Sequence, residues 1–530
     1  MSFDISGFKS PSLFLLLVSV AGILICAFPQ HLWPQHANPQ HVEPQNMWTQ
    51  HVGPTELEQI EQYYQAGEYS RAAEMLEQRR DSGHITPAGL SFLALCYLQM
   101  EDISAAEGAL AISERLDPEG YLLLIAKGNL LMIKEEYTSA ERVFQRAREL
   151  YPRQSAPQSG MVHAVYAQAL QHLRAHEYAK AADLLGRADS IQPGNREVMA
   201  ARIAALKQTP RYEELKEVYR RFIDLYPNYP DTYAGLGVVL WEQNEISKAL
   251  PYLQRAVELD SQDPMAFFLL GQRASRQGEK ERARSLLREA IGKAVYMYSR
   301  YQMEVAGELQ SQKQTQKQTL NSSHRSEGPS SQEGTGEQQS AEEEAERIER
   351  LRELSRSAEK PQQIIKDSLE LLPELYENDD ELQQDLEQLS RWYPNSVEIR
   401  SHLAEYYFGM DLIDAALKEW QALTEKFPFN AEAHLGVGRS YMALQRFDRA
   451  LLSLRRALDL APEDREVYTY LEQLYEMKNN KNEYLDVLEH RLLRDRYNPQ
   501  LLQAAARAAR SQGRDDLAEE YLQRAKDLQQ

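Results

Sequence analysis

The chain has 530 residues and a net charge of −20, from 80 acidic and 60 basic residues, and it contains two cysteines. This acidic balance argues against nucleic acid as a partner, because such binding depends on basic side chains that neutralise phosphates. The two cysteines, Cys26 and Cys96, exclude a framework of several disulfides.

The first predicted element is an uncharged apolar stretch, residues 13–28. As a helix it would span roughly 24 Å, which suits a signal sequence or a short membrane anchor. Lys9 precedes it and the next basic residue is Arg71, so the positive-inside rule predicts that the rest of the chain is exported. Three fates stay open for segment 1–28: an uncleaved anchor, a cleaved signal, and lipid attachment at Cys26. We predict a membrane-anchored or exported protein with its repeats on the extracytoplasmic side.

Residues 29–53 form a spacer built from a pentad that begins Pro-Gln-His or a close variant. Proline at every fifth residue favours an extended, polyproline-like backbone that rises about 3.1 Å per residue. Histidines five residues apart are then ~15 Å from each other, too far to share one metal ion. We therefore predict a structural spacer, with weak metal binding as the alternative, for the tract that holds His31, His36, His41 and His51.

After the spacer the sequence repeats itself with a period of 34 residues. Gly237 and Gly271 show this spacing in a first array of about seven units, residues 53–297. A slip of seven residues near "PRQSAPQ" interrupts that array. A second array of about five units, residues 363–530, keeps the same period.

Each unit contains two amphipathic stretches of helical period, joined by a short turn such as "AGEY" or "KEEY". Small residues recur where the two helices are expected to approach most closely, and a proline near the end ends the second helix. The unit 465–498 departs from this pattern, with Glu472 and Tyr484 at small-residue positions, and we expect it to pack loosely. The clearest unit, 431–464, carries the pattern at Gly438, Tyr441, Ala450, Leu454, Ala457 and Pro462.

These residues and their spacing resemble the tetratricopeptide repeat family. The resemblance implies an all-α fold, a tetratricopeptide α-solenoid of helix–turn–helix repeats in two arrays. Between the arrays lies a linker, residues 298–362. Its stretch 310–340 contains one large apolar residue, Leu320, and cannot bury enough surface to offset the entropy of ordering. We predict a linker that is disordered in the middle and has flanking helices.

No catalytic motif has local support in the sequence. "GLG" at 235–237 and "GVG" at 436–438 look like the start of a dinucleotide-binding loop, but both lie inside predicted helices with no preceding strand. Helix packing explains their glycines, although a catalytic triad assembled from distant segments stays open. We predict no enzyme activity, no cofactor and no metal site.

The resemblance also implies where partners bind, because the first helix of each unit lines the concave face in this family. A hydrophobic groove on such a scaffold suits an extended or helical segment of another protein. The alternative is that several of these residues belong only to the core. The candidate partner-binding residues are Leu98, Ile125, Met132, Tyr166, Trp241 and Phe268.

These patterns together predict a non-enzymatic protein–protein interaction scaffold of the cell envelope. It would bind partner proteins or peptides, and the membrane through its N-terminal segment. Two alternatives stay open for the last helix: charged residues such as Glu519 and Arg524 keep its outer face solvated, or a partner or a second copy of the C-terminal repeat covers apolar residues such as Leu522. One alternative is an accessory subunit that positions a cell-wall or polysaccharide enzyme. Another is an adaptor that faces the cytosol.

Overall fold

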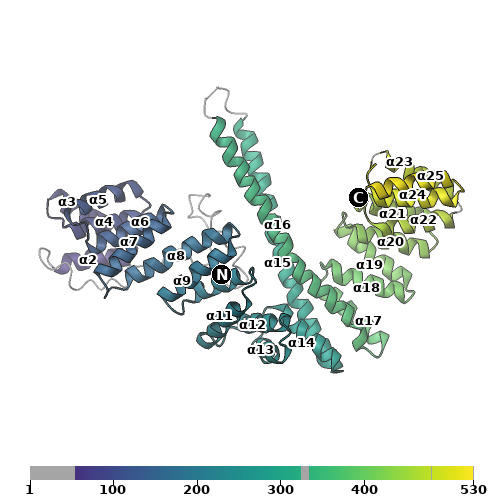
Figure 1. Ribbon diagram of the computed structural model, residues 1–530, viewed down its shortest axis with the longest axis horizontal. Coiled ribbons are helices and arrows are strands. Elements are labelled where there is room, and N and C mark those ends of the chain that lie inside the picture. Colours follow the sequence, from purple (N-terminus) through teal and green to yellow (C-terminus); the bar gives the residue numbers. More distant parts are fainter. Residues whose placement is uncertain (1–53, 324–332, 479, 494, 529–530) are drawn as a thin grey trace. The chain divides into compact units, whose positions relative to one another are not determined.

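The computed structural model describes residues 54–323, 333–478, 480–493 and 495–528. The predicted membrane segment and the pentad spacer lie outside these residues, and so does the middle of the predicted linker. All regular structure in the described residues is helical (Figure 1). None of the described helices is both long enough and apolar enough to cross a membrane. The chain divides into two compact units, with the boundary between Asp260 and Ser261.

The first unit consists of helical pairs, in which a helix A is followed by a short turn and a helix B. The slip near "PRQSAPQ" lengthens one helix A, α8, to 19 residues, whereas α6 has 13. The helices are α2 (Pro54–Gln65), α3 (Tyr69–Asp81), α4 (Pro87–Gln99), α5 (Ile103–Leu116), α6 (Tyr121–Ile133), α7 (Tyr137–Leu150), α8 (Ala156–Arg174), α9 (Tyr178–Ile191), α10 (Arg196–Leu206), α11 (Tyr212–Leu225), α12 (Pro230–Glu242) and α13 (Ile246–Glu258).

The second unit continues the same alternation of helix A and helix B. Its helices are α14 (Pro264–Arg276), α15 (Lys280–Ser323), α16 (Glu333–Leu371), the 3-10 helix η2 (Pro373–Leu375), α17 (Asp379–Trp392), α18 (Val397–Gly409), α19 (Ile413–Lys426), α20 (Ala431–Ala443), α21 (Phe447–Leu460), α22 (Arg465–Met477), α23 (Lys481–Leu492), α24 (Pro499–Ser511) and α25 (Asp515–Asp527).

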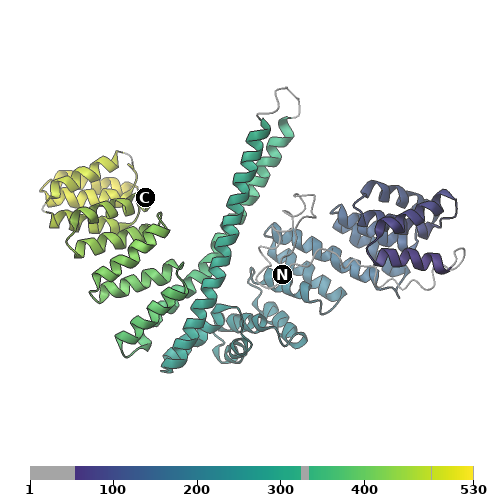
Figure 2. The same ribbon diagram turned by 180° about the vertical axis from the view of Figure 1, so that it is seen from behind.

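Helices α15 and α16 occupy most of the predicted linker. They pack side by side as a long antiparallel hairpin (Figures 1 and 2). Helix therefore extends further into residues 310–340 than composition alone predicts, and only 324–332 lies outside the described residues. The physical reason is that each long helix continues a repeat helix that is already packed, so the cost of nucleating a new helix does not arise.

The pairing of α14 and α15 also differs from the predicted arrays. The sequence assigns α14 and the first part of α15 to the first array and the rest of α15 to the linker, whereas both helices pack with α16 inside the second compact unit. Three ion pairs, each joining residues 97 apart in sequence, add to the packing of α15 against the segment that contains α17. Residues four apart lie on one side of a helix, so the three basic residues follow one another along α15 and face Glu377, just before α17, and two residues of α17. The pairs are Lys280–Glu377, Arg284–Glu381 and Arg288–Asp385.

Asp385 is the buried member of this set, with 3% of its surface exposed. Arg288 donates from Nε to Asp385 Oδ2 at 2.9 Å, and the Tyr376 hydroxyl donates to the same carboxylate. A buried carboxylate requires such donors, because an unpaired charge in the interior is costly. The other two pairs are more exposed and contribute less to stability.

Most described turns from helix A to helix B share one backbone conformation, although the turn between α10 and α11 contains no residue with a positive φ. One residue in the turn has a positive φ, a left-handed conformation that costs a non-glycine residue about 1–2 kcal/mol. Some repeats have glycine at this position, which adopts the conformation without strain, and others have a non-glycine residue there. The residues are Gly67, Glu101, Glu135, His176, Asn244, Gly278, Asp411, Gln445 and Gly513.

The small residues lie at the closest contacts between helices, as predicted. A Cβ atom added to Gly237 would lie 2.6 Å from Leu253 Cδ2, and one added to Gly438 would lie 2.6 Å from Leu454 Cδ2. In each case the leucine follows the glycine by sixteen residues and lies on the helix B of the same pair. The two glycine-containing triplets are therefore helix-packing sites within α12 and α20.

The looser packing expected for the unit 465–498 stays a prediction, and the larger side chains at its small-residue positions have packing partners. Tyr484 is 3% exposed, and its ring stacks on Tyr475 with 5.3 Å between centroids. Its hydroxyl donates to the carbonyl of Tyr468 at 3.1 Å. The Glu472 carboxylate accepts a hydrogen bond from Arg507 Nε at 3.1 Å. Larger side chains fill the space left by the missing small residues, and their polar atoms find partners.

Substitution of Gly436 by alanine tests the close approach of helices. Its Cβ would overlap the ring of Trp420, which is 1% exposed and cannot move aside. We expect Gly436→Ala to lower the free energy of unfolding by about 1–3 kcal/mol, measured by urea denaturation followed by circular dichroism. The control is Gly108→Ala in α5, where an added Cβ meets no atom within 4 Å. That control should raise stability by about 0.5–1 kcal/mol. Equal effects of the two substitutions would contradict the packing argument.

Candidate functional site

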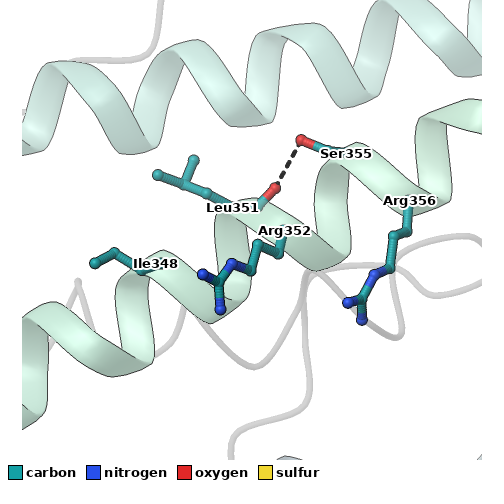
Figure 3. A pocket seen from close by; sticks show the side chains of 5 residues that line it. All are labelled: Ile348, Leu351, Arg352, Ser355 and Arg356. Atoms are coloured by element: carbon teal, nitrogen blue, oxygen red, sulfur yellow. Dashed lines mark hydrogen bonds between the residues drawn. The ribbon is translucent and has the colours of Figure 1, made fainter. Parts of the chain in front are cut away.

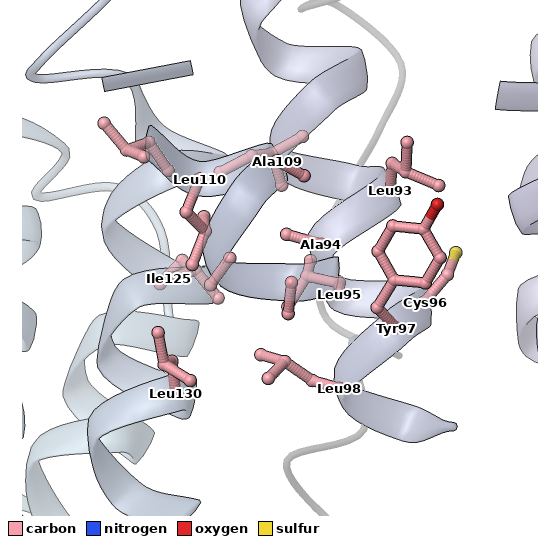
Figure 4. Close-up of a cluster of buried hydrophobic side chains, with 14 of the residues drawn as sticks. Leu93, Ala94, Leu95, Cys96, Tyr97, Leu98, Ala109, Leu110, Ile125 and Leu130 are labelled. Carbon is pink, nitrogen blue, oxygen red and sulfur yellow. The ribbon is translucent and has the colours of Figure 1, made fainter. Parts of the chain in front are cut away.

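Two of the predicted partner-binding residues lie in the core of the first unit. Leu98 in α4 is 5% exposed and Ile125 in α6 is 7% exposed. Both belong to one cluster of buried hydrophobic side chains that extends from α2 to α8, and Figure 4 labels members from α4, α5 and α6. Met132 packs against this cluster and is only partly buried. Met132 therefore presents more surface to a partner than the two buried residues.

Three other predicted residues lie on separate helices. Tyr166 in α8 and Trp241 in α12 are half-buried, and Phe268 in α14 is 7% exposed and belongs to the second unit. Burial, and then the negative charge of Glu197, raises the pKa of Tyr166 to about 12. Its hydroxyl thus stays protonated at neutral pH and can donate a hydrogen bond. The partner-binding role of all six residues stays a prediction.

A second surface, in the second unit, is polar, and none of the predicted partner-binding residues lies on it. Helices α18, α20 and α22 each carry glutamate as their second residue, and these three residues form what we call the acidic row: Glu398, Glu432 and Glu466. A carboxylate in the first turn of a helix is stabilised by the helix dipole, which accounts for each of them singly. The sequence signal was an acidic residue at one repeat position in three successive units.

The carboxylates of this row influence one another. The pKa of Glu432 is raised above its ordinary value, and burial is the largest cause. Lys366 opposes that shift, while the negative charges of Glu405, Glu398 and Glu466 add to it. The row is therefore a region of negative potential that one lysine only partly offsets.

Arg439 lies beside the acidic row and links three helices. From α20 it donates through Nη1 and Nη2 to Glu405 of α18, at 2.8 and 3.2 Å. Its guanidinium carbon lies 4.8 Å from the ring centroid of Phe408 and 5.3 Å from that of Tyr470. A planar guanidinium between two rings, held by a bidentate carboxylate, is a fixed group. Arg439 therefore neutralises Glu405 and leaves the row itself acidic.

Two cavities in the second unit offer further surfaces. One, of about 390 Å³, is lined only by residues of α16, among them Ile348, Arg352 and Arg356 (Figure 3). Ser355 in that cavity donates its hydroxyl to the Leu351 carbonyl at 2.9 Å (Figure 3). The other, of about 490 Å³, lies between α15 and the end of α17, and includes Arg284, Arg288, Tyr296, Trp392 and Tyr393.

Chemically reactive groups are few among the described residues. Within that part of the chain no group of His, Cys, Asp and Glu side chains could hold a metal ion. The histidine tract lies outside it. Cys96 is fully buried, and burial raises the pKa of its thiol to about 12, so at neutral pH the thiol stays protonated.

Comparison with known proteins identifies the repeats. A family model described as tetratricopeptide repeat matches residues 93–155, 211–264, 234–296 and 402–465. Human mitochondrial import receptor subunit TOM70 is 23% identical over 200 residues, covering 37% of this chain and 33% of the relative. The chain thus matches about a third of the length of that curated relative.

One solved structure with a similar arrangement is yeast Tom70, at 13% identity and a TM-score of 0.31. The match covers 90% of this chain and 96% of the Tom70 chain. Another is a chain of the Naa15/Naa10 complex bound to HypK-THB, at 14% identity and a TM-score of 0.30. The match covers 89% of this chain and 75% of that chain. The predicted fold class, an all-α tetratricopeptide-repeat solenoid, is confirmed by the helical pairs and the matching family model.

Replacement of Arg439 tests its linking role. Arg439→Gln removes the charge that Phe408, Tyr470 and Glu405 contact, and we expect a loss of about 1–3 kcal/mol in the free energy of unfolding. Arg439→Lys keeps the charge but lacks the planar fork, so its loss should be intermediate. Urea denaturation monitored by tryptophan fluorescence measures both. If the lysine and glutamine variants matched the wild type, the contacts of Arg439 would not stabilise the fold.

Proposed function

We propose that the chain is a non-enzymatic protein–protein interaction scaffold of the cell envelope, which binds partner proteins or peptides through the helix A faces of its repeats. Tetratricopeptide-repeat proteins generally mediate interactions between proteins. The observation that supports this role here is the side-chain pattern of the first unit. Met132, Tyr166 and Trp241 lie on successive or nearby A helices, and each is half-buried rather than enclosed in the core. Half-exposed aromatic side chains and methionine are typical of protein interfaces.

The name of the human relative is consistent with this proposal. It is called an import receptor subunit, and a receptor recognises another molecule. The similarity covers 200 residues, so only recognition by a repeat surface is carried over to this chain. Transport and the mitochondrion belong to that protein.

The location in the envelope rests on the sequence of the N-terminal segment. Its apolar stretch, with Lys9 on one side and no basic residue before Arg71 on the other, supports export of the repeats. A membrane contact through that segment and self-association through the C-terminal repeat remain parts of the proposal.

Photocrosslinking tests partner binding. A photoreactive benzoylphenylalanine in place of Trp241 should give a discrete crosslinked product in membrane extracts, because this half-buried side chain lies on a helix A face. The control position is Leu116, on the helix B α5 of the same unit and 61% exposed. A crosslinked product at 241 but not at 116 is the expected result. Identical products at both positions, or none at either, would oppose a helix A binding surface.

A reporter fusion tests location. A reporter enzyme that is active only outside the cytoplasm, fused after Gln530, should be active, since the charge asymmetry around the apolar stretch predicts export. The control deletes residues 13–28 and should abolish that activity. Activity only from a cytoplasmic reporter at the same site would favour the adaptor that faces the cytosol.

A further inference from the structure

The hairpin of α15 and α16 leaves large apolar side chains exposed at one level along its length. Leu309 of α15 is 43% exposed and Ile348 of α16 is 42% exposed. Leu309 lies 14 residues before the end of α15, and Ile348 lies 15 residues after the start of α16. Because the two helices pack side by side and run antiparallel, similar distances from their connection place both residues at about the same level (Figures 1 and 2).

Both residues also lie on the same side of the hairpin. Leu309 follows the half-buried Val305 by four residues, and Ile348 precedes the half-buried Leu351 by three. At about 100° per residue, each is rotated in the same sense, by about 40–60°, from a side chain that packs between the helices. In antiparallel helices, rotation in the same sense leads to the same side of the pair. Leu309 and Ile348 therefore form one exposed apolar patch.

On one side of this patch the surface of α16 is basic. A cavity of about 390 Å³ adjoins Ile348, and Arg352 and Arg356 are among the residues that line it (Figure 3). Arg352, Arg356 and Lys360 follow one another at intervals of four residues, and all three are exposed, so they lie along one side of the helix. The stretch 347–360 contains five basic and three acidic residues.

On the other side of the patch, toward the connection to α15, the hairpin is acidic. Residues 333–346 of α16 include six glutamates and no basic residue, whereas residues 311–323 of α15 include two lysines and no acidic residue. This half of the hairpin therefore has an excess of four negative charges. Acidic residues early in a helix and basic residues later also suit the dipole of α16 itself. The dipole does not account for the exposed apolar patch between them.

We propose that a second copy of this chain packs against this face of the hairpin, with the two α16 helices antiparallel and the two apolar patches in contact at a two-fold axis. A two-fold rotation about an axis through the patch, perpendicular to the helices, reverses the direction of the second hairpin. The acidic end of each α16 then lies against the basic stretch of the other. The inference goes beyond the proposed function, because this surface is separate from the C-terminal repeat.

Charge complementarity identifies a second copy as the occupant. The face is acidic on one side of the patch and basic on the other, so it matches its own reversed image. A parallel arrangement of the two hairpins would bring like charges together. A wholly acidic partner would be repelled by the glutamate-rich end, and a wholly basic partner by the arginines.

Paired charge reversals test the proposal. Glu342→Lys/Glu346→Lys makes the acidic end more basic, and Arg352→Glu/Arg356→Glu makes the basic stretch acidic. The mass of the full-length protein is measured by size-exclusion chromatography with multi-angle light scattering in a mild detergent. Each variant alone should have about half the mass of the wild-type complex, because like charges then face each other. An equimolar mixture of the two variants should regain the wild-type mass, because a basic face then meets an acidic one.

A substitution in the apolar patch has a matched control on the same helix. Leu309→Asp places a charge at the two-fold axis and should also halve the mass. Met303 is 66% exposed, but it lies two residues from both Tyr301 and Val305, on the side of α15 away from α16. Met303→Asp should therefore keep the wild-type mass, and circular dichroism of all variants should be unchanged.

Three outcomes would overturn the proposal: a wild type no heavier than its charge variants, no recovery of mass on mixing, or equal effects of Leu309→Asp and Met303→Asp. The C-terminal repeat is unchanged in all of these variants. Association through that repeat predicts the same mass for every variant, so it cannot imitate the loss and the recovery.

Discussion

The structure depends on one steric constraint, the close approach of helices A and B within each pair. Gly237 and Gly438 lie against leucine side chains sixteen residues further on, where an added Cβ would come within 2.6 Å. Because the close approach recurs at the same repeat position, successive pairs stack with the same geometry. A solenoid built in this way has the same side of every helix A facing the same direction, so any residue type repeated every 34 residues becomes a row on its surface.

This constraint also explains why the second unit tolerates its unusual features. Helix α15 is 44 residues long and α16 is 39, and each begins or ends as an ordinary repeat helix. The packed ends anchor the hairpin, and the ion pair between Arg288 and the buried Asp385 adds a specific contact between α15 and α17. In the same way, Tyr484 replaces a small residue because Tyr475 and the backbone of Tyr468 accommodate it. Local departures from the repeat pattern are thus compatible with a regular stack when neighbouring side chains complete the contacts.

The acidic row follows from the same geometry. Each of its carboxylates is favourable for its own helix, but burial in the stack, and then the negative charges of Glu405, Glu398 and Glu466, raise the pKa of Glu432. A glutamate in the first turn stabilises its own helix, but in the stack these glutamates repel one another. Arg439 lies against the rings of Phe408 and Tyr470 and is paired with Glu405. It therefore does not neutralise the carboxylates of the acidic row.

The sequence alone determined the helical fold, the 34-residue period and the position of the turns. These follow from short-range rules: apolar periodicity, small residues at close contacts, and prolines that end helices. It also identified the glycine triplets as packing sites. It did not show that α15 contacts α17 through side chains 97 residues apart, such as Arg288 and Asp385. Nor did it separate Leu98 and Ile125, which are buried, from Tyr166 and Trp241, which are half-buried. Both outcomes were decided by tertiary packing, since burial and long-range pairing depend on which helices meet, and periodicity within one helix carries no such information.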